Sequence, residues 1–355
     1  MKITKNEIYK HYIALDWSQE IVAIASMRDT STEVEHTTIL PDLKLMKQYL
    51  KSRPGKKILT IEETTTSHWL YVELKDYVDK ILICDAYRNS LLKDGPKTDK
   101  LDARKLCFLL RSGMLKEVYH SMDKTYEVRK LVSTYEDFVN SSVRIQNQRS
   151  AIFRAEGKDH KKEKLLSKSD LTKFITEKQN LAIEHFAQTK KEFEEVFIKI
   201  RKENKVIRQL DKISGIGLII SVGIYATVID ASRFANKYKY YAYCGLAEHQ
   251  KDSGGRSYGK KRIRHNKLLK KHYKTATKAA LRGNNDIRDY YEYLLQNGYS
   301  CEHAQNKITR YIAKVSYAIM KNGTGADRQL KVWNDTNDIN AVVDLIIKET
   351  TMGLG

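Results

Sequence analysis

The chain has 355 residues and is strongly basic, with a formal net charge of +20 at pH 7. So many positive charges attract polyanions, and they repel one another in the folded protein. We therefore expect an anionic binding partner, with nucleic acid as the first candidate. Its four cysteines, Cys84, Cys107, Cys244 and Cys301, are too far apart for a CxxC or zinc pattern, which predicts free thiols in a reducing compartment.

The sequence predicts no membrane segment. The first residues lack the apolar core and cleavage site of a signal peptide. Residues 213–229 are uncharged, but they are shorter than the roughly 20 residues that span a bilayer and contain glycines and serines. A buried helical hairpin explains them better. We therefore expect a cytoplasmic protein without membrane contact.

Strands alternate with helices in the first third of the chain. Two strand patterns at residues 11–15 and 20–27 predict a β-hairpin at the start. The patterns that follow predict a helix at 41–50, a strand at 58–62, a helix at 67–78 and a strand at 81–84. This alternation indicates an α/β domain at residues 1–120, with a mixed or parallel sheet covered on both faces.

Acidic side chains end two of the predicted strands. Asp16 closes the first strand, and Glu62 closes the strand at 58–62. If these strands are neighbours, their carboxylates emerge at the same edge of the sheet. Glu63 points to the opposite face and competes with Glu62 for the role.

Two further acids, Asp99 and Asp102, follow a Gly-Pro turn and begin a predicted helix. Residues three positions apart share a helix face, where a divalent cation would offset the repulsion between the two carboxylates. Mg²⁺ suits such a site because it binds a few carboxylates together with water and phosphate oxygens. In the alternative interpretation Thr98 caps the helix and the aspartates only complement its dipole. The order Asp, Glu, Asp, Asp favours a two-metal phosphodiester site on an RNase H-like sheet.

The middle region, residues 121–210, is charged, poor in glycine and predicted to be helical. Large apolar residues recur every seven positions, at Phe186, Phe193, Ile200 and Ile207. This spacing is typical of a coiled coil, but an amphipathic helix packed within its own subunit would show the same stripe. Residues 157–168 are the predicted turn between two long helices.

The third region, residues 211–325, is predicted to be mostly helical. Gly215 and Gly217 lie in a Ser-Gly-Ile-Gly stretch that is typical of a helix-hairpin-helix turn, whose backbone N–H groups contact phosphate. A glycine-rich basic loop, a basic helix and a final amphipathic helix at 304–321 follow. Residues 326–355 are predicted to form an appended tail.

The basic loop contains a serine, Ser253, directly before two glycines. Many cations follow it: Arg256, Lys260, Lys261, Arg262, Arg264, Lys267, Lys270 and Lys271. Taken separately, a Ser-Gly-Gly is usually a turn and a lysine run is usually a solvated face. Together they suit an in-line attack of the serine on a DNA phosphate, with cations that hold the developing charge.

Six blocks carry a resemblance to a known family: YIALDWSQE, LTIEETTTSHW, GPKTDKLDARKL, LDKISGIGLIISVG, YYAYCGLAEHQKDSGGRSYGK and KITRYIAKVSYAIMKNG. In order and spacing they resemble the DEDD-type transposases of the IS110 insertion-sequence family, relatives of the Piv DNA invertase. The resemblance implies a RuvC-like N-terminal domain, a coiled-coil middle and a C-terminal transposase domain. It implies metal ligation by Asp16, Glu62, Asp99 and Asp102, with two Mg²⁺ ions per site, and a 5′-phosphoserine link at Ser253.

The same resemblance implies the partners. They are double-stranded donor and target DNA, a structured non-coding bridge RNA that guides the reaction, and further copies of the chain in a dimer or tetramer. The active site would combine the acidic domain of one subunit with the serine domain of another. The chain departs from the family pattern at Asn266 and Lys267, where a glycine is usual, and at Glu63, where a small residue is common.

Three hypotheses follow for the function. The first is a site-specific DNA recombinase in which Ser253 is the nucleophile. The second is a RuvC-like nuclease that cuts with metal-activated water and uses the serine loop only to bind DNA. The third is a non-catalytic scaffold that binds RNA or DNA.

Overall fold

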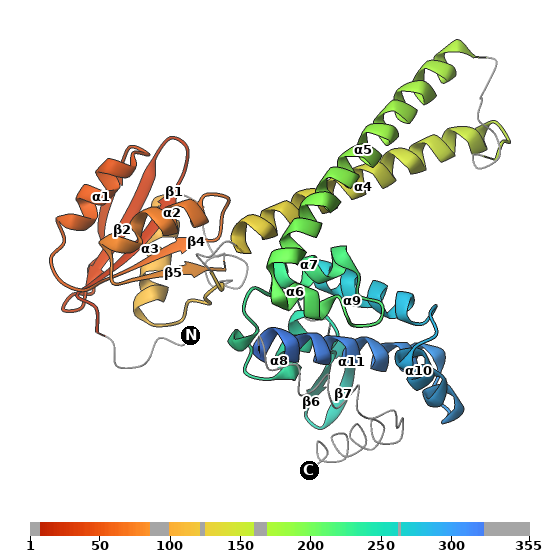
Figure 1. Ribbon diagram of the computed structural model, residues 1–355. Helices are drawn as coiled ribbons and strands as arrows, with labels where there is room; N and C mark the ends of the chain where they lie inside the picture. The colour runs from red at the N-terminus through yellow and green to blue at the C-terminus, as the bar shows by residue number, and fades with distance from the viewer. Residues whose placement is uncertain (1–7, 86–98, 121–124, 160–168, 262–263, 323–355) are drawn as a thin grey trace. The chain divides into compact units, whose positions relative to one another are not determined.

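The computed structural model describes residues 8–85, 99–120, 125–159, 169–261 and 264–322 (Figure 1). The chain divides into two compact units, Met1–Asp123 and Lys124–Gly355. Separate hydrophobic clusters fill each unit, so each has a core of its own. The division of the second unit into residues 121–210, 211–325 and 326–355 stays a prediction, and the tail lies outside the described residues.

A five-stranded mixed sheet forms the centre of the first unit, in the order β3-β2-β1-β4-β5. The strands are β1 (His11–Trp17), β2 (Val22–Arg28), β3 (Glu35–Ile39), β4 (Lys57–Glu62) and β5 (Lys80–Cys84). β1 pairs antiparallel with β2, as the predicted hairpin requires, and β2 pairs antiparallel with β3. β1, β4 and β5 run parallel to one another.

Helices cover both faces of this sheet, which confirms the predicted arrangement. On one face, α1 (Leu43–Lys51) and α2 (Ser67–Leu74) bury apolar residues against those of the strands, such as Ile13 and Leu59. α3 (Asp99–Arg111) covers the other face, where Ala14 and Leu82 belong to the core. The predicted helix at 67–78 ends as α2 at Leu74 and continues as a short 3-10 turn at Lys75–Tyr77.

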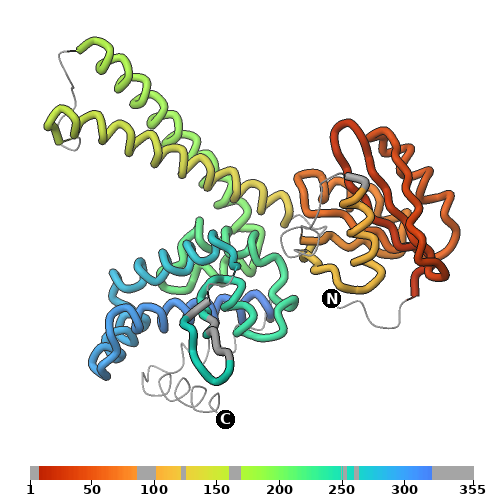
Figure 2. Tube along the Cα trace, turned by 180° about the vertical axis from the view of Figure 1, so that it is seen from behind, coloured from red at the N-terminus to blue at the C-terminus, as the bar shows by residue number. Residues whose placement is uncertain are grey.

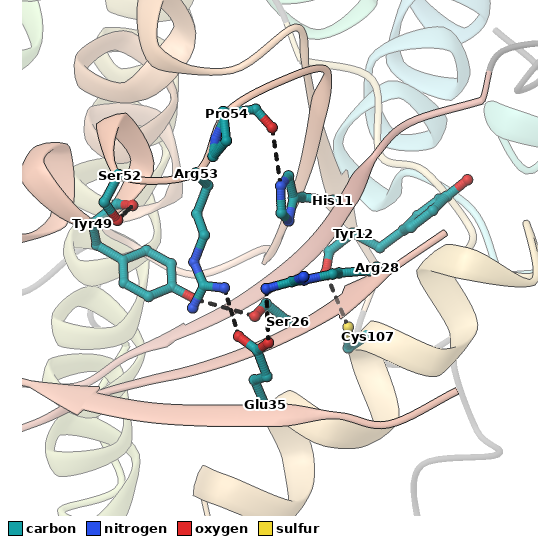
Figure 3. A network of polar contacts seen from close by, with 10 residues as sticks. All are labelled: His11, Tyr12, Ser26, Arg28, Glu35, Tyr49, Ser52, Arg53, Pro54 and Cys107. Carbon is teal, nitrogen blue, oxygen red and sulfur yellow. Dashed lines mark hydrogen bonds and ion pairs between the residues drawn. The ribbon is translucent and has the colours of Figure 1, made fainter. Parts of the chain in front are cut away.

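The edge strand β3 was not predicted, because polar residues dominate it. Glu35 holds it to its surroundings by accepting a 2.5 Å hydrogen bond from Arg53 and by forming an ion pair with Arg28 (Figure 3). The bond from Arg53 lowers the pKa of this glutamate. Charge pairs thus contribute at this edge, where an apolar pattern is missing from the sequence.

Two long antiparallel helices, α4 (Thr125–Ala155) and α5 (Asp170–Glu203), begin the second unit (Figures 1 and 2). The predicted apolar stripe lies against α4 of the same chain: Phe186 and Phe193 both stack on Phe138. The stripe is interrupted at Asn204, which caps α6 (Lys205–Leu210), so Ile207 belongs to a separate helix. These contacts are those of a helix packed within its own subunit, while a coiled coil between subunits stays a prediction.

The rest of the second unit is a helical domain with one small hairpin. Its elements are α7 (Leu218–Val228), the 3-10 turn Ala231–Arg233, α8 (Lys237–Tyr243), β6 (His249–Ser253), β7 (Arg256–Lys261), α9 (Lys267–Ala280), α10 (Asp286–Gln296) and α11 (Cys301–Asn322). The rings of Tyr240 and Tyr273 are fully buried in its core, where their hydroxyls share a 2.5 Å hydrogen bond. α10 was not predicted, and the predicted basic loop is a two-stranded hairpin.

The structure also describes the cysteines and the apolarity of the helices. All four cysteines are free thiols, as predicted. In the part of the chain that is described, the helices are either too short or too polar to cross a membrane.

Candidate functional site

The acidic ends of β1 and β4 lie side by side. These strands are parallel neighbours in which Leu15 pairs with Ile61, so the next residues, Asp16 and Glu62, follow in the same register. Side chains alternate between the faces of a sheet. Both acids therefore share the α3 face, to which Ala14 and Ile58 contribute core residues. The structure brings these two half-buried acids to one edge of the sheet.

Helix α3 runs antiparallel to β1 and is fastened at its far end. Cys107 Sγ donates a 3.2 Å hydrogen bond to the carbonyl of Tyr12 (Figure 3). Arg111 donates hydrogen bonds to the carbonyls of Asp29 and Ser31, which follow the last residue of β2. That end of β2 is paired with the first residue of β1, so the end of α3 lies near the beginning of β1.

The start of α3 therefore lies at the height of the acidic sheet edge. From Cys107 back to Asp99 the helix rises about 12 Å. From Tyr12 to Asp16 the strand rises about 13 Å. The first residue of α3 and the end of β1 therefore lie at the same height along the sheet. The side chain of Asp99 lies outside what the structure describes.

Asp102 lies on the stripe of α3 that faces the sheet. Its position continues the buried series Ala103, Leu106, Cys107 and Leu110, because it precedes Leu106 by one helical turn. The side chain is half-buried. The helix thus presents a carboxylate toward the same face of the sheet on which Asp16 and Glu62 lie.

Ser253 is the last residue of β6, at the tip of the hairpin. It pairs with Arg256 across the turn formed by Gly254 and Gly255, whose φ angles are 57° and 74°. Two successive positive φ angles define a type I′ turn, which residues with a Cβ adopt only with strain. The two glycines after Ser253 therefore have a specific structural role, because they allow this turn. The side chain of Ser253 is not among those described.

Cations follow the hairpin and surround the start of α9. The side chains of Arg256 and Arg264 are exposed, whereas those of Lys260, Lys261 and Arg262 lie outside the described part. Asn266, which stands where the family pattern has a glycine, caps α9 by accepting a hydrogen bond from the N–H of Leu269.

Three predicted phosphate-binding lysines occupy the first residues of α9. They are Lys267, Lys270 and Lys271, and no acid balances them in the first turn. Positive charge at a helix N-terminus opposes the helix dipole and costs stability. Lys271 offsets part of this cost by donating a 2.5 Å hydrogen bond to Glu136 of α4.

Two family models match the chain. A model of DEDD transposases of the IS110 type, described as "Transposase", matches residues 13–155. A second model, described as "Transposase IS116/IS110/IS902 family", matches residues 207–292. The chain belongs to the IS110 transposase family. Membership makes DNA transposition its class of activity.

The first match of this IS110 transposase includes all four predicted acids, and the second includes Ser253 and α9. A comparison with curated proteins gives a short similarity to "Putative glutamate--cysteine ligase 2" of Solibacter usitatus (strain Ellin6076), 56% identical over 36 residues. That stretch is 10% of this chain, and the chain spans 9% of the length of that relative. So short a match carries no function to the transposase.

The donor atoms at the acidic edge fit a hard divalent cation. Asp16, Glu62 and Asp102 offer only carboxylate oxygens, the ligands that Mg²⁺ accepts together with water. However, among the described side chains no three of the histidines, cysteines and acids are grouped closely enough to hold a metal ion. The fourth predicted ligand of the transposase, Asp99, is outside that set.

A further acid at this edge of the sheet was not predicted. Asp85 directly follows β5 and is 8% exposed, so an acid stands at or next to the end of each of the three parallel strands. Because Cys84 pairs with Glu62, Asp85 is level with Glu63 and lies on the face opposite to Asp16 and Glu62. Burial raises the pKa of the Cys84 thiol to about 12, and the negative charges of Glu62 and Asp85 add to the effect. The signal in the sequence was the one used for Asp16, an acid that closes an apolar strand.

The two glycines of the predicted helix-hairpin-helix turn differ in their surroundings. A Cβ on Gly215 would lie 2.2 Å from the carbonyl oxygen of Ala276, and the residue has a φ of 87°. Gly215 therefore lets the loop before α7 pack closely on α9. A Cβ on Gly217 would meet nothing within 4 Å, and this residue caps α7. Of the two, only Gly217 lies at an open position.

Proposed function

We propose that this transposase is a bridge-RNA-guided DNA recombinase that cleaves and rejoins DNA through a 5′-phosphoserine at Ser253. The observation that carries the proposal is the convergence of Asp16, Glu62 and the start of α3 at one edge of the sheet. The acids come from three separate segments of the chain. Local folding of one segment would not require such an arrangement.

In this proposal Asp16, Glu62, Asp99 and Asp102 hold Mg²⁺, with two ions per site. Bound Mg²⁺ supplies charge stabilisation to the phosphate under attack. The donor chemistry of Asp16, Glu62 and Asp102 supports this choice of cation over a thiophilic one.

Ser253 Oγ attacks the scissile phosphorus. The bond from phosphorus to the 3′ oxygen breaks, and that oxygen leaves as a hydroxyl with the proton that the serine gives up. The 5′ phosphate remains on the serine, so the bond energy is kept for strand exchange. The type I′ turn supports this role, because two glycines at the tip leave room for a sugar–phosphate backbone.

The exposed cations near the hairpin would bind the DNA backbone. Arg256 is exposed and pairs directly with Ser253, which suits contact with the attacked phosphate. Lys267 and Lys270 oppose the dipole of α9, so an anion bound there would relieve an unfavourable arrangement. Lys267 is exposed and Lys270 is half-buried, and release of their counterions on binding DNA would make the affinity depend on salt.

The guide RNA and the assembly belong to the proposal through the family resemblance. We expect a structured non-coding RNA to bind together with donor and target DNA, and the net charge of +20 supports more than one nucleic acid partner. We also expect a dimer or tetramer in which the acids of one subunit serve the serine of another. A mixture of Asp16→Asn and Ser253→Ala proteins would then regain part of the activity that each lacks.

A second candidate is the nuclease that cuts with water. It is favoured by one observation, that the acids belong to a compact unit separate from the one that contains the serine hairpin. A nuclease would need only the acidic unit for its chemistry, as long as the other unit bound DNA.

A serine substitution separates the two candidates. The recombinase loses both the covalent protein–DNA adduct and DNA cleavage in Ser253→Ala. The control is Ser257→Ala, which removes an exposed hydroxyl from the opposite strand of the same hairpin. The assay is denaturing electrophoresis of labelled donor DNA after reaction with Mg²⁺ and the co-purified RNA. Cutting that persists in Ser253→Ala would assign the protein to the nuclease class.

A further inference from the structure

Two histidines of the first unit face each other outside the acidic site. His68 lies in α2, and His120 follows a segment that runs beside β5. Nδ1 of His68 and Nε2 of His120 share a hydrogen bond of 2.8 Å, in which the tautomers decide which ring donates. Both rings are half-buried, which leaves the pair accessible from solvent.

The positions of the two rings suit a shared metal ion. Imidazole nitrogens bind zinc-like ions at about 2.0–2.1 Å, so two rings on one ion with an angle between 90° and 109° have centroids about 4.6–5.3 Å apart. The centroids of His68 and His120 are 5.0 Å apart. The same geometry places the nitrogens about 2.9–3.3 Å apart. An ion would therefore replace the proton that the two nitrogens share, and the rings would have to tilt and separate slightly to point at it.

We infer that His68 and His120 form a binding site for a late divalent transition metal such as Ni²⁺, Cu²⁺ or Zn²⁺. Imidazole prefers these ions, whereas Mg²⁺ prefers oxygen, so this site and the acidic edge select different metals. Burial lowers the pKa of His68 and so favours the neutral ring that a metal requires.

The site is of the exchangeable kind. No third histidine, cysteine or acid joins the pair among the described side chains, so water fills the other positions of the ion. Structural zinc sites use four protein ligands, and a site with two binds more weakly. Tyr71 packs against His120 with ring centroids 4.9 Å apart and supports that ring.

Metal binding would fasten the end of the first unit. The segment before His120 is already held to β5, where the N–H of Val118 donates to the carbonyl of Ile83 at 2.8 Å. His120 is the last described residue before α4 begins at Thr125. An ion shared with α2 would replace the hydrogen bond between His68 and His120 by metal–nitrogen bonds at the place where the chain leaves this unit. Since the ion binds only the folded arrangement, it also stabilises it.

The test is calorimetric titration of Ni²⁺ into the full-length protein with Mg²⁺ in excess. Excess Mg²⁺ occupies the oxygen ligands, which leaves the imidazole pair as the expected site. We expect one bound Ni²⁺ per chain, with binding lost in His68→Ala and in His120→Ala. His303→Ala, which removes an exposed histidine of α11, is the control and should bind as the unsubstituted protein does.

A fluorescence measurement keeps the test independent of folding defects. Trp69 is next to His68 in the chain, so Ni²⁺ bound at the histidine pair should quench its emission. The ring of Trp69 also contacts that of Trp17, with ring centroids 5.4 Å apart. The quenching should disappear in His120→Gln, whose circular dichroism is compared with that of the unsubstituted protein. Ni²⁺ affinity in both alanine variants equal to that of the unsubstituted protein, or no Ni²⁺ binding by the unsubstituted protein at millimolar concentration, would overturn the inference.

Discussion

Replacement of Gly215 by alanine tests whether this glycine serves packing or phosphate binding. The added Cβ would lie 2.2 Å from the backbone oxygen of Ala276 and 2.8 Å from the backbone nitrogen of Ala280, so no flexible side chain can yield. A residue with a Cβ in a left-handed conformation costs about 1–2 kcal/mol. An extra methyl group in a packed interior costs about 1–3 kcal/mol more. We therefore expect Gly215→Ala to lower the free energy of unfolding by about 2–5 kcal/mol.

Thermal unfolding measures this difference. For a unit of more than 200 residues the loss corresponds to a decrease of about 4–20 °C in Tm. The control is Gly217→Ala, two residues away, where a Cβ meets nothing and a change of N-cap residue costs about 1 kcal/mol or less. If Gly215→Ala melted with the unsubstituted protein, or Gly217→Ala were the less stable variant, the packing argument would be wrong. DNA binding measured well below both melting temperatures then reports on any phosphate contact at Gly217.

Three further predictions concern the acids, the cations and a buried histidine. Asp16→Asn should fold normally but lose Mg²⁺-dependent cleavage, whereas Glu63→Gln, on the opposite face of the sheet, should still cleave. Equal activity of the two variants in a cleavage assay would contradict the proposed site. Changing Lys267 and Lys270 together to glutamine should make the slope of the logarithm of the DNA affinity against the logarithm of salt concentration shallower by about two at most. An unchanged slope in filter binding would show that these lysines do not contact DNA phosphates. Burial lowers the pKa of His272 to about 4, below that of a histidine in the unfolded chain. The folded protein therefore keeps its full free energy of unfolding above pH 6.5 and loses part of it as the pH falls toward 4. Denaturant titrations should show this loss, and in His272→Gln the free energy of unfolding should depend less on pH.

The sequence predicted the first sheet well because its central strands are apolar. β1, β2, β4 and the edge strand β5 each contain at least three consecutive buried residues, and short apolar runs of this kind predict strands. β3 was missed because its residues, EHTTI, are mostly polar; it forms by pairing with β2, and Glu35 adds charge pairs with Arg28 and Arg53. The β6–β7 hairpin was missed for a related reason: its strands, HQKDS and RSYGKK, contain almost no apolar residue.

The acidic site was predictable in part. The strand ends and the Asp-x-x-Asp spacing are visible in the sequence, and the pairing of β1 with β4 fulfils the condition on which the use of Asp16 and Glu62 depended. Asp85 could have been found by the same argument. The direction of α3 could not, because it depends on the bonds that Cys107 and Arg111 make to distant backbone carbonyls.

Among the described residues, the serine hairpin is a sheet of two strands, β6 and β7. A two-stranded ribbon is at best marginally stable in water. The N–H of Asn266, the N-cap of α9, donates a 2.8 Å hydrogen bond to the carbonyl of Tyr243, the last residue of α8, so the two helices are joined at the base of the hairpin. A shift of α8 against α9 would therefore move this base, and with it the turn that follows Ser253.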